Sequence, residues 1–220
     1  MPIVLVEELI RWSWIGDHTD DIVARLLEHL QLTAIPVAVG FVIAFPMALA
    51  AIRWPQLYSP LLAFTGVLFT IPSLALFVLM IPFTGLTAPT AIIPLTLYTL
   101  LILLRNTVEG LNSVPRDVRE AAEAMGFKRF RQLFAVEVPL ALPVIIAGLR
   151  IATVTTIGLI TITAVIGQGG LGQFFIDGFT RRFPTPLVVG LVLSVAFAVT
   201  ADLLLLGIQK LLMPWQQSQE

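Results

Sequence analysis

Long apolar stretches, separated by short polar segments, dominate this chain. The stretches 31–52, 58–82 and 88–104 contain no charged side chain, 140–166 contains one arginine, and 186–208 is similarly apolar. A helix of about 20 residues crosses the hydrocarbon core of a membrane. Helices in soluble proteins rarely stay apolar on every side over that length. The pattern therefore predicts an all-α, polytopic membrane protein with about five transmembrane helices in one domain, 1–220.

The composition supports a lipid-covered surface. Hydrophobic residues make up 57% of the 220 residues and charged residues 12%, and the mean hydropathy is +0.94. Soluble domains carry about 25% charged residues, so membrane lipid is expected to cover much of this chain. The net charge of −1 argues against binding to nucleic acid. With no cysteine and only His18 and His29 as histidines, no metal site is expected.

The first residues differ from the spans. The segment 3–15 is too short and too acidic to cross a membrane, and we expect an interfacial helix held by Trp12 and Trp14, with an extra span as the alternative. No basic residue precedes its apolar run, so no secretory signal peptide is expected.

Several predicted spans contain proline, namely Pro36, Pro46, Pro72, Pro94 and Pro143. Neighbouring helices and hydroxyl side chains can satisfy the backbone groups that proline frees in a membrane. These prolines either kink helices for packing or supply bends for a moving gate. Pro72 and its neighbour Ser73 are therefore candidates for the transport pathway or gate.

The basic residues indicate the orientation. Six of them fall in or beside one loop: Arg105, Arg116, Arg119, Lys128, Arg129 and Arg131. The positive-inside rule places this loop in the cytoplasm, the N-terminus outside and the C-terminus inside. Arg181 and Arg182 fit poorly, because they then lie in an outside loop.

The loop 113–138 is the one long amphipathic region. One helical face is formed by Val118, Ala121, Ala122 and Met125, and a second stripe by Phe127, Phe130, Leu133 and Phe134. Gly126 separates the two stripes, where a residue able to take a positive φ lets the chain turn. Ser113 is expected to cap the first helix, with Pro115 in its first turn. Such a two-helix corner, apolar and rimmed by Arg and Glu, is typical of a protein-binding surface.

The same loop carries a spaced motif. It reads Glu120-Ala121-Ala122, three residues, Gly126, nine residues, then Val136-Glu137-Val138-Pro139. This motif resembles the signature of permease subunits of ATP-binding-cassette (ABC) importers, with valine in place of its Ile and Leu. The resemblance implies a coupling helix that inserts into a cleft on a separate ATPase. The coupling residues would be Glu120, Ala121, Ala122, Met125, Gly126, Phe127 and Pro139.

The resemblance covers residues 30–212 and narrows to the osmoprotectant branch, which takes up glycine betaine, choline or carnitine. The segments that carry it are 70–76, 103–107, 138–143, 148–150 and 164–172. It implies a type I importer permease core of the methionine-permease kind. It also implies an ABC ATPase dimer, a second permease copy or paralogue, and an extracytoplasmic substrate-binding protein as partners. The chain lacks a phosphate-binding loop motif, so ATP and Mg are expected on the ATPase and no cofactor in this chain.

Two features inside the spans invite further interpretation. The segment 167–172 matches G-x-G-x-x-G, but it ends an apolar run, so a re-entrant or tight turn lining the pathway through Gly169 and Gly170 is expected instead of a nucleotide site. Arg150 must either reach the membrane edge or find a partner, and Asp202 is the candidate. The pair would serve packing or gating.

Other functions remain open at this point. The same architecture could import an amino acid or a betaine-like thione. An ion-driven secondary transporter would show internal repeats and paired intramembrane carboxylates, whereas only Asp202 is present. An intramembrane enzyme would need a nucleophile–base or metal constellation, and none is visible.

Overall fold

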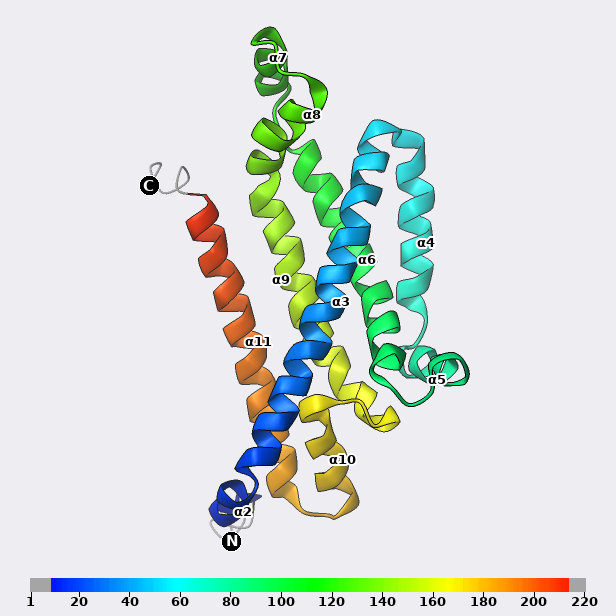
Figure 1. Cartoon of the computed structure of the whole chain (residues 1–220), viewed down its shortest axis with the longest axis vertical. Helices are drawn as coiled ribbons and strands as arrows, with labels where there is room; N and C mark the ends of the chain where they lie inside the picture. Colours follow the sequence, from blue (N-terminus) through cyan, green and yellow to red (C-terminus); the bar gives the residue numbers. More distant parts are fainter. Residues whose placement is uncertain (1–8, 214–220) are drawn as a thin grey trace, which may run out of the picture. The chain divides into compact units, whose positions relative to one another are not determined.

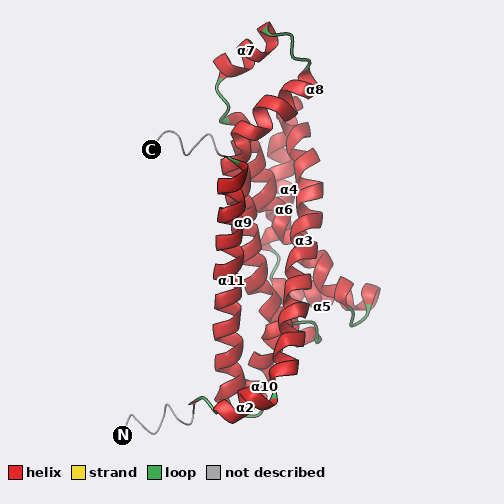
Figure 2. Ribbon diagram, turned by 60° about the vertical axis from the view of Figure 1, so that its left-hand side comes forward, coloured by secondary structure: helices red, strands yellow, loops and turns green. Residues whose placement is uncertain are grey.

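A computed structural model describes residues 9–213, which form helices joined by short turns, with no strand in that range (Figure 1 and Figure 2). The α-helices are α2 (Trp12–Asp17), α3 (Thr19–Arg53), α4 (Tyr58–Thr70), α5 (Ser73–Thr84), α6 (Ala88–Asn112), α7 (Arg116–Ala124), α8 (Arg129–Gln132), α9 (Val138–Thr163), α10 (Gln173–Thr180) and α11 (Pro184–Leu212). A π-helical turn, Leu133–Glu137, joins α8 to α9. The all-α fold is as predicted.

The structure has four or five candidate spans, in agreement with the prediction of about five. Four described segments are long and apolar enough to cross a membrane: Thr19–Arg53, Ala88–Asn112, Arg129–Ile166 and Pro184–Leu212. A fifth span is formed if the bent pair Pro55–Thr70 and Ser73–Thr84 crosses as one unit.

The expected span 58–82 is not one continuous helix. The chain leaves the helical conformation at Pro72, whose φ of −57° and ψ of 127° precede α5. Proline lacks an N–H and pushes the residue before it, Ile71, away from the α region. By contrast, Pro94 and Pro143 remain inside α6 and α9.

Two helices run beyond the apolar stretches that predicted them. The helix α3 begins at Thr19 instead of near residue 31, and its polar first turns are held by Arg25, which contacts Asp21 at 3.5 Å and Glu28 at 3.1 Å. The helix α6 continues past residue 104 with an Arg105–Glu109 pair at 3.0 Å. Ion pairs at this spacing stabilise the charged ends by which these helices extend beyond the predicted stretches.

Part of the segment 3–15 is helical, and its interfacial position stays a prediction. Residues 12–17 form α2, and Trp12 is 76% exposed. The predicted helix is not continuous, because residues 10 and 11 are not helical. Residues 3–8 of the predicted segment lie outside the described residues.

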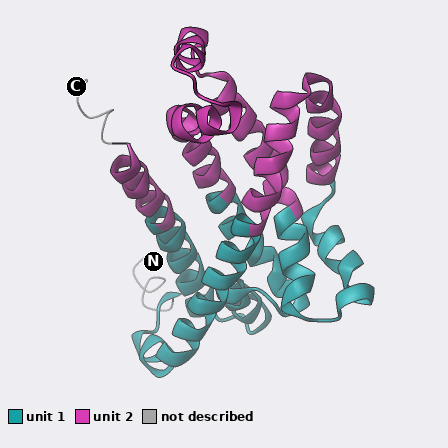
Figure 3. Ribbon diagram, turned by 45° about the horizontal axis from the view of Figure 1, so that its top comes forward, with its two compact units in different colours: residues 1–38, 71–96, 153–200 teal, residues 39–70, 97–152, 201–220 magenta. Residues whose placement is uncertain are grey.

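The chain divides into two units (Figure 3). Unit 1 contains residues 1–38, 71–96 and 153–200, and unit 2 contains 39–70, 97–152 and 201–220. Four helices, α3, α6, α9 and α11, contribute residues to both.

Each unit has its own apolar core. The core of unit 1 is formed by Leu32, Phe77, Ala91, Leu95, Ile160 and Ile166. The core of unit 2 sets alanines of α3 against larger residues of α6: Ala44, Ala48, Ala51, Leu100, Leu103, Leu104 and Val108. Small residues on one helix let the backbones approach closely, which is how membrane helices associate without a hydrophobic driving force.

Candidate functional site

The helix α7 ends in a turn built around Gly126. The Phe127 N–H donates to the Ala122 carbonyl at 3.1 Å, and the Gly126 N–H donates to the Glu123 carbonyl at 2.9 Å. With Gly126 at a φ of +82°, these bonds form a Schellman C-cap. The predicted tight corner is therefore present, and it explains why the glycine stands four residues after Ala122.

The predicted N-terminal cap is wrong. The Ser113 hydroxyl donates to the Gly110 carbonyl at 2.7 Å, and Pro115 occupies the N-cap position of α7 without a side-chain cap bond. Ser113 still lies within reach of the last turn of α6, and its hydroxyl satisfies a carbonyl there.

The corner exposes the apolar surface that the sequence indicated. Met125 is 69% exposed and Phe130 is 76% exposed. Phe130 contacts Phe134 with ring centroids 4.8 Å apart, and the Arg131 guanidinium lies 4.7 Å from the Phe127 ring. Large apolar side chains held at a polar end of a membrane protein suit a protein partner.

The two alanines of the motif face differently. Ala121 is exposed, as is Glu120, whereas Ala122 is 1% exposed. Ala122 therefore packs inside this chain, and only Ala121 remains available for close approach to a partner.

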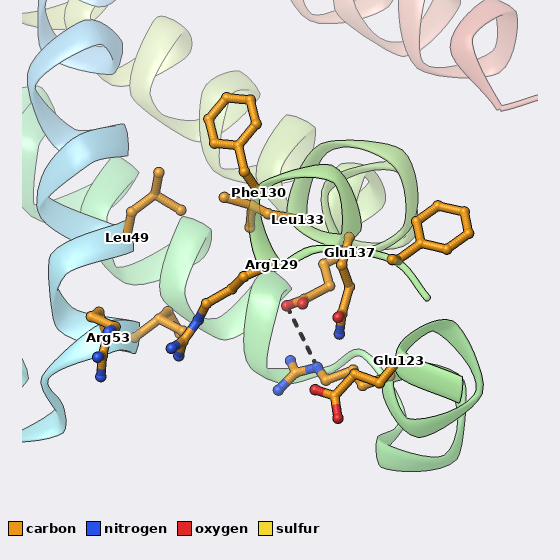
Figure 4. A pocket seen from close by; sticks show the side chains of 11 residues that line it. Leu49, Arg53, Glu123, Arg129, Phe130, Leu133 and Glu137 are labelled. Atoms are coloured by element: carbon orange, nitrogen blue, oxygen red, sulfur yellow. Dashed lines mark ion pairs between the residues drawn. The ribbon is translucent and has the colours of Figure 1, made fainter. Parts of the chain in front are cut away.

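A cavity of about 870 Å³ opens beside this corner within unit 2 (Figure 4). Its charged lining residues are Arg53, Arg119, Arg129, Glu123 and Glu137. Across it runs an ion pair between Arg119 Nε and Glu137 Oε2 at 3.5 Å, the dashed line in Figure 4. Residues 49–53 of α3 form one wall and residues 119–137 the other.

The predicted partner of Arg150 is confirmed. Its Nε and Nη2 each lie 2.7 Å from one carboxylate oxygen of Asp202, so α9 and α11 are joined by a two-point ion pair in unit 2. The two side chains are 28% and 32% exposed.

The glycine-rich segment forms a tight turn in unit 1. Gly167 and Gly170 have φ angles of +78° and +48°. The chain passes so close to α3 that a Cβ on Gly170 would lie 2.7 Å from the His29 side chain. Gly169 is similarly close to Ala164, at 2.4 Å. The expected tight turn is therefore found, and whether it lines a pathway stays a prediction.

His29 holds that turn in place. The Leu171 N–H donates to His29 Nδ1 at 3.3 Å, so Nε2 carries the ring proton and donates to the Ile157 carbonyl at 3.2 Å. The ring is fully buried and meets Phe197 edge-on at 5.5 Å.

The remaining candidates occupy junctions between helices. Pro72 and Ser73 form the break before α5, and Pro139 lies in the first turn of α9, directly after the π-helical turn. Hydroxyl groups in the spans bond mainly to their own helix, as Thr161 does to Gly158 and Thr163 to Ile160.

Two polar contacts between separate segments were missed by the sequence interpretation. His29 bonds to groups that lie 128 and 142 residues away in sequence. The Arg119–Glu137 pair was also missed, although both charges fall in the singled-out loop. His29 follows Glu28 in a polar segment ahead of the charge-free stretch 31–52, so no local pattern singles it out.

The fold and this corner identify the class of protein: a helical membrane protein with several spans and a polar corner formed by α7 and α8. Comparison with known proteins then identifies the family. Over residues 40–215 the chain matches the family described as the binding-protein-dependent transport system inner membrane component, and it belongs to that family. The chain is therefore an ABC importer permease of the inner membrane, with a transport role.

Individual relatives agree with this assignment. The osmoprotectant import permease protein OsmW of Salmonella typhimurium is 36% identical over 203 residues, covering 90% of this chain and 94% of that protein. The glycine betaine/carnitine/choline transport system permease protein OpuCB of Bacillus subtilis is 34% identical, covering 81% of this chain and 82% of its own length. The choline transport system permease protein OpuBD of Bacillus subtilis is 36% identical, covering 84% of this chain and 83% of its own length.

Solved structures share the fold. An inward-facing structure of the MetNI methionine ABC transporter superposes with a TM-score of 0.77 at 25% identity, covering 96% of this chain and 99% of the matched chain. This agrees with the expected methionine-permease-like core.

Proposed function

We propose that this chain is the membrane-spanning subunit of an ATP-driven importer of osmoprotectants such as glycine betaine, choline or carnitine. A separate ATPase would grip the corner formed by α7 and α8. The observation that carries this proposal is the Schellman-capped α7, whose Glu-Ala-Ala and Gly126 stand at the spacing of a coupling helix. The substrates named for the relatives support the choice of osmoprotectants.

The coupling residues act at different places in this proposal. Glu120 pairs with a basic group of the ATPase, and Ala121 lets its backbone approach closely. Met125 and Phe127 contribute apolar contact, Gly126 sets the corner, and Pro139 marks where the movement enters α9. Closure of two ATPase subunits on ATP would then move the permease between inward-open and outward-open states.

The proposed assembly contains a second permease copy or paralogue, an ATPase dimer and an extracytoplasmic binding protein. Of the 18 most apolar consecutive residues of α11, only 11% are buried within this chain. This helix therefore offers most of its surface to lipid or to the second permease. ATP and Mg belong to the ATPase.

The orientation we propose places α7 and α8 in the cytoplasm, with the N-terminus outside and the C-terminus inside. Because the chain contains no cysteine, single cysteines can be labelled without background. Phe179→Cys should react with an impermeant maleimide in intact cells, and Met125→Cys only after permeabilisation; the opposite pattern would contradict the orientation.

Uptake measurements test the substrate. Cells that lack other osmoprotectant uptake would express the complete transport system, and uptake of labelled glycine betaine, choline, carnitine and methionine would be compared at high osmolarity. We expect ATP-dependent uptake of at least one quaternary amine and none of methionine. Uptake of methionine alone would replace the proposed substrate with an amino acid, the class suggested by the MetNI neighbour.

A further inference from the structure

The side chain of Arg119 joins three elements of unit 2. Arg119 lies on α7, its Nη2 donates to the Leu111 carbonyl in the last turns of α6, and its Nε approaches Glu137 at the end of the π-helical turn. One guanidinium therefore connects the proposed coupling helix to the helix before it and to the start of α9.

The contact with Glu137 is incomplete. The Arg119 and Glu137 side chains are 28% and 14% exposed, and Arg119 Nε is buried without an aligned hydrogen bond, although Glu137 Oε2 is 3.5 Å away. A buried N–H without a partner is unfavourable. A small movement of α7 toward Glu137 would complete the bond, whereas a small movement away would break the pair.

The Arg150–Asp202 pair shows the difference. There, two nitrogens each lie 2.7 Å from a carboxylate oxygen, so that pair is already complete. Of the two, only the Arg119–Glu137 pair has room to tighten.

The carboxylate end of the pair also lies on an unusual element. The residues Leu133–Glu137 form a π-helical turn, which takes more residues per turn than the α-helix that follows it. Such turns are rare and are frequently found at functional sites. Conversion to α-helix would change the register of the segment that enters α9.

We infer that Arg119 and Glu137 form a positioning pair that passes a displacement of α7 to α9. The inference rests on the proposed coupling role of α7. Pushed by the ATPase, α7 completes the ion pair and draws the π-helical turn with it. The movement then reaches Arg150, which lies in the same helix, and through its ion pair reaches Asp202 on α11.

A charge-exchange experiment tests the pair. Arg119→Gln, Glu137→Gln and the exchanged double variant Arg119→Glu/Glu137→Arg would be purified with their ATPase and binding protein and reconstituted in liposomes. Three quantities are measured: ATPase recovered with the permease, ATP hydrolysed, and substrate transported per ATP. Arg116→Gln is the matched control, because Arg116 is exposed on the same helix and has no ion pair within residues 9–213.

We expect each single variant to retain its ATPase but to transport about tenfold less substrate per ATP, the exchanged variant to recover part of this loss, and Arg116→Gln to match the wild type. The isosteric Glu137→Gln decides the outcome if Arg119→Gln does not assemble.

Unchanged transport per ATP in Glu137→Gln would overturn the inference. Loss of assembled complex with normal transport per ATP in the remainder would also overturn it, because the pair would then be a static brace. A wild-type complex that shows no ATP-driven uptake contradicts the proposed function itself and is recognised before any variant is compared.

Discussion

Arg150 and Asp202 form a two-point ion pair in which both contacts measure 2.7 Å and which joins α9 to α11. The residues stand 52 positions apart, in two separate apolar segments. A lone charge in either segment would be costly in a membrane, so each side chain makes the other tolerable.

Exchange of the two charges tests this relationship. Arg150→Asp and Asp202→Arg alone should each lower the amount of inserted permease, because each leaves two like charges facing one another. The double variant should recover much of it. Immunoblots of membrane fractions measure the amount, and Arg105→Asp, which breaks an exposed pair with Glu109, is the control. A double variant no better than either single one would show that the pair does not stabilise the fold.

Substitution of Gly126 tests the C-cap of α7. A Cβ at this position would meet nothing within 4 Å, so its cost is backbone strain at positive φ and not a clash. We expect Gly126→Leu to insert normally, to weaken the cap by about 1–2 kcal/mol and to uncouple ATP hydrolysis from uptake. Gly126→Asn should be milder, because Asn tolerates the left-handed region. Equal uptake by Gly126→Leu and wild type would remove the coupling role of the corner.

The turn 167–172 allows strain and clash to be separated. Gly167→Ala and Gly170→Ala both place alanine at positive φ, but only at Gly170 would the new Cβ lie 2.7–2.8 Å from His29. Gly170→Ala should therefore lower the melting temperature of the purified protein clearly more than Gly167→Ala does. Similar values for the two variants would show that α3 readily moves away from the turn.

Substitutions of His29 test its two hydrogen bonds separately. Asn can replace the Nδ1 acceptor that meets Leu171, and Gln can replace the Nε2 donor that meets Ile157. Each should lower the free energy of unfolding by about 1–3 kcal/mol, because one hydrogen-bonding group is left unsatisfied. His29→Leu loses both bonds and should lower it further. Thermal unfolding in detergent measures the differences. If His29→Leu were as stable as the wild type, His29 would not hold the turn 167–172 in place.

Close packing of α6 and α9 gives a further prediction. A Cβ on Gly148 would lie 2.4 Å from the Asn106 Cβ, whereas Gly158 on the same helix has nothing within 4 Å. Overpacking lowers the free energy of unfolding by about 1–3 kcal/mol. Gly148→Ala should therefore destabilise the protein, and Gly158→Ala should not. Chemical unfolding of the two purified variants compares them, with equal midpoints as the contrary outcome.

Much of the architecture could be predicted from the sequence. Apolar stretches of membrane length, three of them without any charge, indicated the spans, and the spacing from Glu120 to Gly126 indicated the corner. These signals are local, because a helix makes its backbone hydrogen bonds within itself and lipid can cover any apolar surface. The extension of α3 to Thr19 was less visible, because charged residues that pair with one another interrupt the apolar pattern there.

The sequence by itself determined the membrane-spanning, all-helical character of this protein, the position of its polar corner and the need for glycine at residue 126. Only the tertiary structure decided that Pro72 breaks a helix while Pro94 does not, and that Ala122 faces inward. It also decided that His29 bonds to groups 128 and 142 residues away, and that Arg119 meets Glu137. The reason is physical: a span needs only enough apolar residues in a row, whereas a hydrogen bond needs two particular groups within about 3 Å, and which groups meet depends on how the helices pack.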